Sequence, residues 1–191
     1  AMRSLETGVC HIYHKKFDDW TNDRLLEYIA EPTDDRLYAI AQLIRGGVDL
    51  VLIYNRTKID MFFLEKFKNI VEFERVVEAA PMDIEVLREA KRMGFSDKFI
   101  GQLWGVSQHD MYLLREKNGI FPVYKMIDTC ASEFSSYVPY FYSTYEDENE
   151  SLVSDKEKIV VLGSGPIRIG QGVEFDYSTV HAIWSIREAG Y

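Results

Sequence analysis

The stretch GVDLVLIYNRTKIDMFFLEKF, residues 47–67, has a relative later in the chain, GFSDKFIGQLWGVSQHDMYLLREK at residues 94–117. Each stretch begins with a glycine that ends a preceding helix. Each then places a capping residue, Asp49 or Ser96, before a short apolar helix. A tight break and another helix follow in both. The pattern predicts an internal repeat of two helix–turn–helix units.

The second helix of each unit opens on a similar motif. Thr57 and Asp60 form T-x-x-D, and Ser107 and Asp110 form S-x-x-D. Both motifs resemble a capping box with Asp in place of the usual Glu, which predicts Thr57 and Ser107 as N-caps. A bulky apolar pair follows each motif at the same offset: Phe63 and Leu64 in one unit, Leu113 and Leu114 in the other.

Further helices surround the two units. Residues 22–29 are amphipathic and follow Thr21, a candidate N-cap. Residues 34–45 have apolar side chains at helical spacing and end at two glycines, and residues 83–93 mirror them before the second unit. Residues 70–79 continue the helix that leaves the first unit. The first two-thirds of the chain are therefore predicted to be helical.

Composition limits the function classes. The chain has 191 residues, 47% hydrophobic and 28% charged, an ordinary globular balance. A formal net charge of -9 repels polyphosphate, so nucleic acid is not expected as a partner. No apolar run is long enough to cross a membrane, so a membrane is not expected as a partner either. The two cysteines, Cys10 and Cys130, lack metal-ligand spacing and are predicted to be reduced, half-buried packing residues.

Two functional interpretations of the helical part, DNA binding and metal binding, are less well supported by the sequence than simple packing of the helices. A DNA-recognition helix needs outward Arg, Lys, Asn or Gln, but residues 61–67 offer three phenylalanines and one lysine. Their aromatic excess is better explained as core or as a surface for another subunit. His11 and His14 share a helical spacing that suits a metal, yet only Cys10 lies nearby to complete the set.

The character of the chain changes after Gly119. The next residues are partly extended, and residues 137–150 combine tyrosines with a run of acids. The aromatic residues there, Tyr137, Tyr140, Phe141, Tyr142 and Tyr145, are predicted to pack along a neighbouring domain. Residues 146–154 read as a loop, which places a domain boundary near Asp155.

A glycine loop follows this boundary. Residues 158–162 read as a buried parallel strand, and Gly163 and Gly165 come directly after it. The third glycine of a dinucleotide fingerprint would fall at Arg168, and no Gly-Lys-Ser/Thr follows, so neither nucleotide motif is present. Residues 178–190 then read as a helix. This strand–loop–helix unit is one step of a parallel α/β layer, and we expect the chain to stop within that domain.

Charged side chains gather in the loop. Arg168, Glu174 and Asp176 follow the carboxyl end of the predicted strand, where α/β folds bind ligands. The alternative, a loop that only shapes the turn, explains the glycines but not this cluster.

The segment GSGPIRIGQGVEFDYSTVHAIWSIREAGY resembles the opening of the second synthetase half of the carbamoyl-phosphate synthase large subunit. Arg168 and His181 match the second-half version of the motif. Upstream, RSLETGV, TKIDMFFLEKFKNIVEFE, AKRMGFSDKFI and PVYKMIDTCASEFSSYVPYFYSTYEDENE resemble, in order, the region between the two halves, which is the family's oligomerisation domain. The resemblance covers essentially the whole chain.

This resemblance implies a mainly α oligomerisation domain with a Tyr-rich arm at residues 1–155. The first βα unit of an incomplete α/β, pre-ATP-grasp domain would follow at residues 156–191. The parent would be a cytoplasmic, glutamine-hydrolysing ligase that makes carbamoyl phosphate from bicarbonate, ammonia and ATP for arginine and pyrimidine biosynthesis. It would use ATP with Mg²⁺ or Mn²⁺ and K⁺, and a glutaminase small subunit.

The resemblance also implies roles for three residues. Gly172 and Glu174 would line the carbamate end of an internal tunnel, and Arg168 would balance anionic charge there or pair with Glu174 or Asp176. No catalytic, cofactor-binding or metal residue is expected within the 191 residues, so the isolated fragment would be inactive. The alternative is a stand-alone helical interaction module, which differs in having no ATP-grasp sequence after Tyr191.

Overall fold

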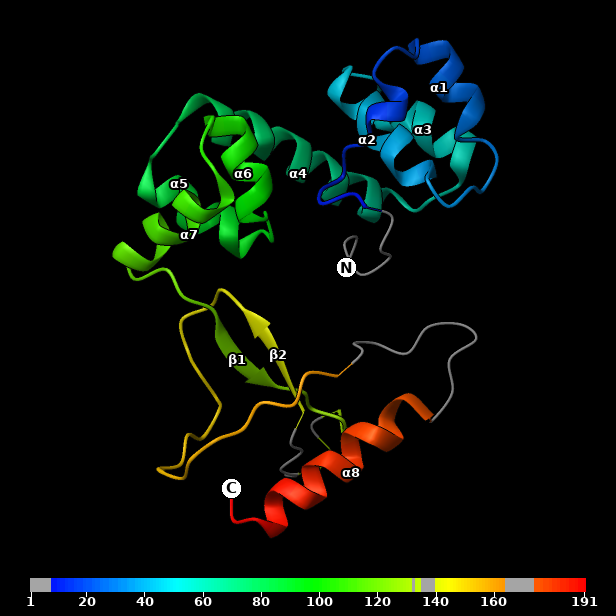
Figure 1. Cartoon of the computed structure of the whole chain (residues 1–191). Helices are drawn as coiled ribbons and strands as arrows, with labels where there is room; N and C mark the ends of the chain where they lie inside the picture. The colour runs from blue at the N-terminus through cyan, green and yellow to red at the C-terminus, as the bar shows by residue number, and fades with distance from the viewer. Residues whose placement is uncertain (1–7, 132, 135–139, 164–173) are drawn as a thin grey trace. The chain divides into compact units, whose positions relative to one another are not determined.

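The computed structural model describes residues 8–131, 133–134, 140–163 and 174–191, the last range with side chains from residue 177 onward. The chain divides into two compact units, Ala1–Glu150 and Ser151–Tyr191. Helices make up most of the first unit, the helical body, while the C-terminal unit holds one long helix (Figure 1). This matches the predicted order of a helical domain followed by the start of an α/β domain.

The first repeat of the helical body is built from short capped helices. A 3-10 turn, Lys15–Phe17, precedes α1 (Asn22–Tyr28), α2 (Arg36–Arg45) and α3 (Leu50–Thr57). As predicted, the Thr21 side chain accepts a hydrogen bond from the Arg24 amide at 3.3 Å, and α2 ends at the two glycines. Gly47 has a φ of 77°, which a residue without Cβ adopts freely.

The second repeat follows a long connecting helix. Helix α4 (Met61–Ala79) leaves the first repeat as predicted and contacts both α2 and α6. Helices α5 (Ile84–Arg92), α6 (Asp97–Trp104) and α7 (Gln108–Lys117) then form the second unit. Ser107 is its predicted N-cap: the hydroxyl accepts from the Asp110 amide at 3.1 Å and donates to the Asp110 carboxylate at 2.6 Å.

The predicted capping box of the first repeat is wrong. Thr57 is the last residue of α3, and its hydroxyl donates to the Ile53 carbonyl at 2.8 Å and accepts from the Ile59 amide at 3.2 Å. Lys58 then turns the chain with a φ of 56°. The N-cap of α4 is Asp60, whose carboxylate accepts from the Phe62 amide at 2.8 Å.

With this correction the two repeats align at an offset of 47 residues. The aligned pairs are Gly47 with Gly94, the N-caps Asp49 with Ser96, the left-handed Lys58 with Gly105, and the N-caps Asp60 with Ser107. Two core positions align in the same way, because Ile53 and Ile100 are fully buried and so are Leu64 and Met111. The sequence pairing of Leu64 with Leu114 was therefore out of register by three residues.

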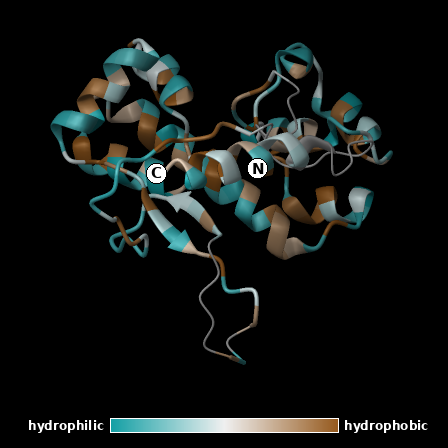
Figure 2. Cartoon of the chain, turned by 60° about the horizontal axis from the view of Figure 1, so that its bottom comes forward, coloured by the Kyte–Doolittle hydropathy of each residue, from teal (hydrophilic) through white to brown (hydrophobic). Residues whose placement is uncertain are grey.

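Each repeat has its own core. One cluster gathers buried side chains from residues 12–71, and the other gathers them from residues 77–120. In Figure 2 the helices carry both hydrophobic and hydrophilic residues, as expected for amphipathic helices packed around cores. Among the described residues, no helix is long and apolar enough to cross a membrane.

A small sheet ends the helical body. Strands β1 (Val123–Met126) and β2 (Phe141–Thr144) pair antiparallel, with Tyr124 opposite Ser143. Tyr145 packs against the second core of this same body, whereas Tyr140 and Tyr142 are exposed. The prediction that the tyrosines pack on a neighbouring domain is therefore wrong for Tyr145, and Tyr137 lies outside the described residues.

The C-terminal unit contains α8 (Glu174–Glu188), which begins four residues before the predicted start. The strand predicted at residues 158–162 does not form, since nothing pairs with it in the described part of the chain. A strand needs a hydrogen-bonded neighbour to be stable. The segment instead lies along α8, where Ile159 and Val161 line a pocket with Ile183 and Ile186.

Candidate functional site

The three predicted tunnel residues cannot be placed on the described structure. Arg168 and Gly172 lie outside the described residues. Glu174 is the first residue of α8, and its side chain is also outside the described part. Their roles therefore stay predictions, and the candidate site must be built from the helical body.

An exposed apolar surface lies on the first repeat. It is formed by α3 and the first turn of α4, and we call it the α3–α4 surface; its residues are Val51, Leu52, Tyr54, Phe62 and Phe63. Val51 and Leu52 are 53% and 52% exposed, and the two phenylalanines are 57% and 56% exposed. The two phenyl rings meet edge to face at 5.4 Å between centroids.

Local structure explains why these side chains point outward. Ile53 and Leu64 are the buried anchors of α3 and α4. Successive residues of a helix are about 100° apart around its axis, so burying one turns its neighbours toward solvent. The N-caps Asp49 and Asp60 fix where each helix starts and therefore which residues become neighbours of the anchors.

Cations border the aromatic residues of the surface. The Lys66 ammonium lies 5.0 Å from the Phe62 ring, and the Lys58 ammonium lies 5.3 Å from the Tyr54 ring. Asp60 and Glu65 are exposed beside them. Several exposed apolar side chains with charged neighbours are typical of a protein contact site.

A buried ionic cluster lies inside the second repeat. The Asp97 carboxylate accepts from Arg115 Nη2 at 2.7 Å and from Lys91 Nζ at 2.9 Å. The cations also donate to backbone carbonyls, Lys91 to Phe95 at 2.8 Å and Arg115 to Ile120 at 3.0 Å. Lys91 and Arg115 are both buried. The cluster joins α5, α6 and α7 and the chain that follows α7.

The environment keeps Asp97 ionised. Burial alone would raise the pKa of its carboxyl, but the hydrogen bonds and charges of Arg115 and Lys91 outweigh burial and hold the pKa below its ordinary value. All three charges are satisfied by one another and by carbonyls, which is the condition for a buried ionic cluster to be stable.

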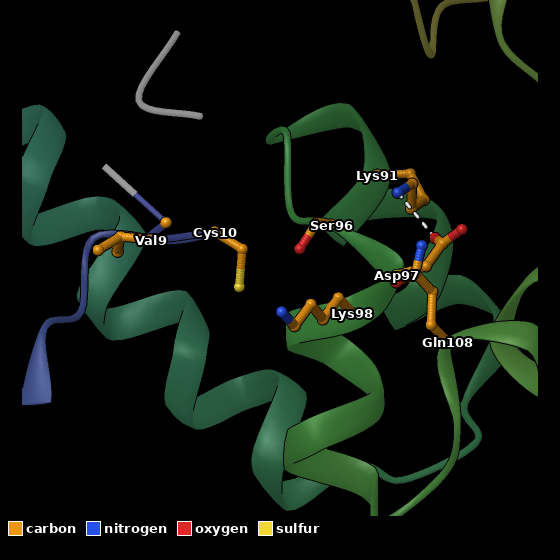
Figure 3. Close-up of a pocket in the computed structure, with 8 residues that line it drawn as sticks. Val9, Cys10, Lys91, Ser96, Asp97, Lys98 and Gln108 are labelled. Atoms are coloured by element: carbon orange, nitrogen blue, oxygen red, sulfur yellow. Dashed lines mark hydrogen bonds and ion pairs between the residues drawn. The ribbon is translucent and has the colours of Figure 1, made fainter. Parts of the chain in front are cut away.

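A pocket of about 490 Å³ opens beside this cluster. Lys91, Ser96, Asp97, Lys98 and Gln108 line one side, and Gly8, Val9 and Cys10 line the other. In Figure 3 the side chains of Cys10 and Lys98 point into the same space, while Lys91 and Asp97 engage each other. The pocket thus marks where the N-terminal segment approaches the second repeat.

His11 and His14 do not form a metal site. His11 Nε2 lies 2.8 Å from the Glu74 carboxylate, and the ring stacks on Phe99 at 3.8 Å. Glu74 is also held by Arg45, whose Nη2 donates at 2.7 Å. His14 caps a turn by accepting from the Lys16 amide at 3.0 Å. The part of the chain that the structure describes holds no group of three or more metal-ligating side chains.

The structure and the sequence comparisons agree on the class of protein. The described residues form a helical body followed by a smaller C-terminal unit. Residues 1–119 match the carbamoyl-phosphate synthetase large chain, oligomerisation domain, and residues 155–191 match the carbamoyl phosphate synthase preATP-grasp domain. The chain belongs to the carbamoyl-phosphate synthetase large-chain family.

Sequence reasoning found only part of this site. It identified the helix after Asp49 as apolar, and it noted the phenylalanines after Asp60. It did not join them into one surface, because the repeat was aligned three residues out of register. The correct N-cap at Asp60 was the available signal. The ionic cluster around Asp97 was missed, since its members are separated in sequence.

Proposed function

We propose that this chain is a segment of a glutamine-hydrolysing carbamoyl-phosphate synthase large subunit. The parent makes carbamoyl phosphate from bicarbonate, glutamine-derived ammonia and ATP, for arginine and pyrimidine biosynthesis. The observation that supports this is the order of the two family matches on one chain, an oligomerisation domain and then a preATP-grasp domain. In that order the helical body joins the two synthetase halves.

The proposed parent acts in the cytoplasm with a glutaminase small subunit. ATP with Mg²⁺ or Mn²⁺, and K⁺, would bind to parts of the parent outside these 191 residues. The contribution of this segment is self-association through the helical body and part of the carbamate passage.

The proposed passage rests on Arg168, Gly172 and Glu174. A glycine leaves room for a small molecule, and a carboxylate can accept hydrogen bonds from an amide or a protonated acid. A guanidinium can balance the negative charge of carbamate. None of the three would take part in bond making.

Assay of the parent tests the proposal. The gene is read beyond Tyr191, and the full-length chain is purified with its glutaminase subunit. We expect an ATP-grasp sequence to follow and glutamine-dependent carbamoyl phosphate to form, with no product from the 191-residue chain alone. A reading frame that ends soon after Tyr191 favours the stand-alone interaction module instead.

The passage has its own test in the parent. In Glu174→Gln, ATP hydrolysis that depends on bicarbonate should continue while carbamoyl phosphate formation falls. Asp147→Asn, a change on the exposed acidic segment, is the matched control and should leave both rates unchanged. Equal loss of both rates in Glu174→Gln would contradict a role confined to the passage.

A further inference from the structure

The two repeats align residue by residue, so the α3–α4 surface of the first repeat can be compared with the equivalent positions of the second. At the offset of 47 residues, three exposed positions differ in kind: Val51, Phe62 and Phe63 of the first repeat correspond to Lys98, His109 and Asp110 of the second. All six side chains are exposed. At these three positions the second repeat is polar, as is usual for exposed positions, and the first repeat is not.

The fourth position of the surface is apolar in both repeats. Leu52 corresponds to Phe99, but Phe99 is 8% exposed while Leu52 is 52% exposed. The difference arises because the chain covers Phe99 with its own N-terminal segment, where the His11 ring stacks at 3.8 Å. In the second repeat, the apolar residue at this position is therefore buried by the chain itself.

The fold does not require the apolar residues of the α3–α4 surface. The second repeat forms the same capped helices with lysine, histidine and aspartate at the equivalent places. Exposed phenylalanines cost solubility and add nothing to the buried cores. Their presence at positions where the second repeat is polar indicates that a partner covers them.

We propose that the α3–α4 surface binds the same surface of a second copy of this chain. This inference rests on the proposed function and names the contact through which the helical body self-associates. A second copy is the occupant favoured here because residues 1–119 match an oligomerisation domain.

The charged residues around the surface suit a symmetric contact. The rim carries Lys58 and Lys66 beside Asp60 and Glu65, so a two-fold arrangement can set each sign against its opposite. A phenylalanine buries about 150–250 Å² when fully covered, and Phe62 and Phe63 are already partly buried, so the two rings supply only part of the about 800 Å² that a standard interface buries on each partner. The paired rings Phe62 and Phe63 therefore supply the apolar centre, and the charged rim completes the contact.

Sedimentation velocity of the 191-residue chain over a wide range of concentrations tests this contact. The variant Val51→Lys with Phe62→His and Phe63→Asp gives the first repeat the polar residues of the second. We expect the unaltered chain to dimerise and the variant to associate at least about tenfold more weakly. The control is Tyr112→Ser with Leu113→Ser, two apolar residues on α7 that are 46% and 45% exposed, and its association should not change.

If the variant fails to fold, hydrogen exchange of the unaltered chain tests the proposed contact instead. Residues 50–66 should exchange more slowly at high than at low concentration, while residues 108–117 should not. A chain that stays monomeric, or protection confined to the second repeat, overturns the inference. If the parent enzyme still makes carbamoyl phosphate in that case, the proposed function stands without this contact.

Discussion

Arg115 and Asp97 form a two-point ion pair that joins α7 to α6. Arg115 Nη2 lies 2.7 Å from Asp97 Oδ2, and Arg115 Nε lies 2.9 Å from Asp97 Oδ1. At the offset of 47 residues, Asp97 corresponds to Leu50 and Lys91 corresponds to Ile44. The first repeat thus has apolar side chains at two of the three positions of the cluster, while Arg115 corresponds to the exposed Lys68.

Removing the carboxylate charge should destabilise the helical body. Asp97→Asn leaves Arg115 and Lys91 buried without a counter-charge, which costs about 3–5 kcal/mol in comparable sites. Urea denaturation followed by circular dichroism measures the change in the free energy of unfolding. Asp147→Asn is the control, because Asp147 pairs with Arg92 at the surface and such a pair contributes about 0–1 kcal/mol. Similar losses in both variants would contradict the buried cluster.

Replacing the whole cluster should cost much less than breaking it. Lys91→Ile, Asp97→Leu and Arg115→Met together install apolar side chains, two of them those of the first repeat. Well-packed hydrophobic replacements of buried ionic triads are often neutral or stabilising by about 1–4 kcal/mol. Urea denaturation should therefore find the triple variant more stable than Asp97→Asn. A triple variant as unstable as the single one would show that backbone bonds from Lys91 and Arg115, rather than the charges, fix the helices.

Stability should fall in acid through two carboxylates. Burial would raise the pKa of both Asp97 and Glu74, but their cationic partners outweigh it and lower each pKa from ordinary values of 3.8 and 4.5. The folded state then holds fewer protons than the unfolded state, so the stabilisation is complete above about pH 4.5 and is lost as pH falls through the lowered values. Urea unfolding between about pH 7 and pH 3 measures this, and Asp97→Asn should flatten the acid limb.

Local patterns predicted the helices well, and the misses have physical causes. Thr21, Ser96 and Ser107 were identified as caps because a cap depends on a few adjacent residues. Thr57 was misread because a threonine hydroxyl can cap the next helix or bond back to its own, and sequence does not decide between them. The strand at residues 158–162 failed because pairing depends on distant residues.

Contacts between residues distant in sequence could not be predicted from the sequence for the same reason. The cluster around Asp97 and the His11–Glu74 pair join residues that only folding brings together. The exposed face of α3 was noticed as apolar, but whether such a run is core or surface depends on tertiary packing. Its reading as a surface needed the exposure of Val51 and Leu52.

Gly101 packs closely against the backbone of the turn before α7. A Cβ at this position would lie 2.6 Å from the Val106 carbonyl oxygen, which the turn before α7 holds in place. Gly101→Ala should therefore destabilise the helical body by about 3 kcal/mol, the range of an overpacked site. The control is Gly105→Ala, where the Cβ meets open space and only the φ of 68° adds strain of about 1–2 kcal/mol. Thermal unfolding compares the two, and a larger loss for Gly105→Ala would contradict this account.

The C-terminal unit should exchange its amide hydrogens faster than the helical body. The apolar side chains of α8, Val180, Ile183 and Trp184, are 38%, 38% and 54% exposed, and the segment predicted as a strand pairs with no other strand in the described residues. Local opening therefore exposes little additional apolar surface and costs little free energy. In α4, by contrast, Leu64, Val71 and Val77 are buried, so opening that helix disrupts both cores. Mass spectrometry after deuterium labelling should find α8 exchanged well before α4. Equal protection of the two helices would mean that α8 is stably packed, and that the exposure of its apolar face does not describe the unit in solution.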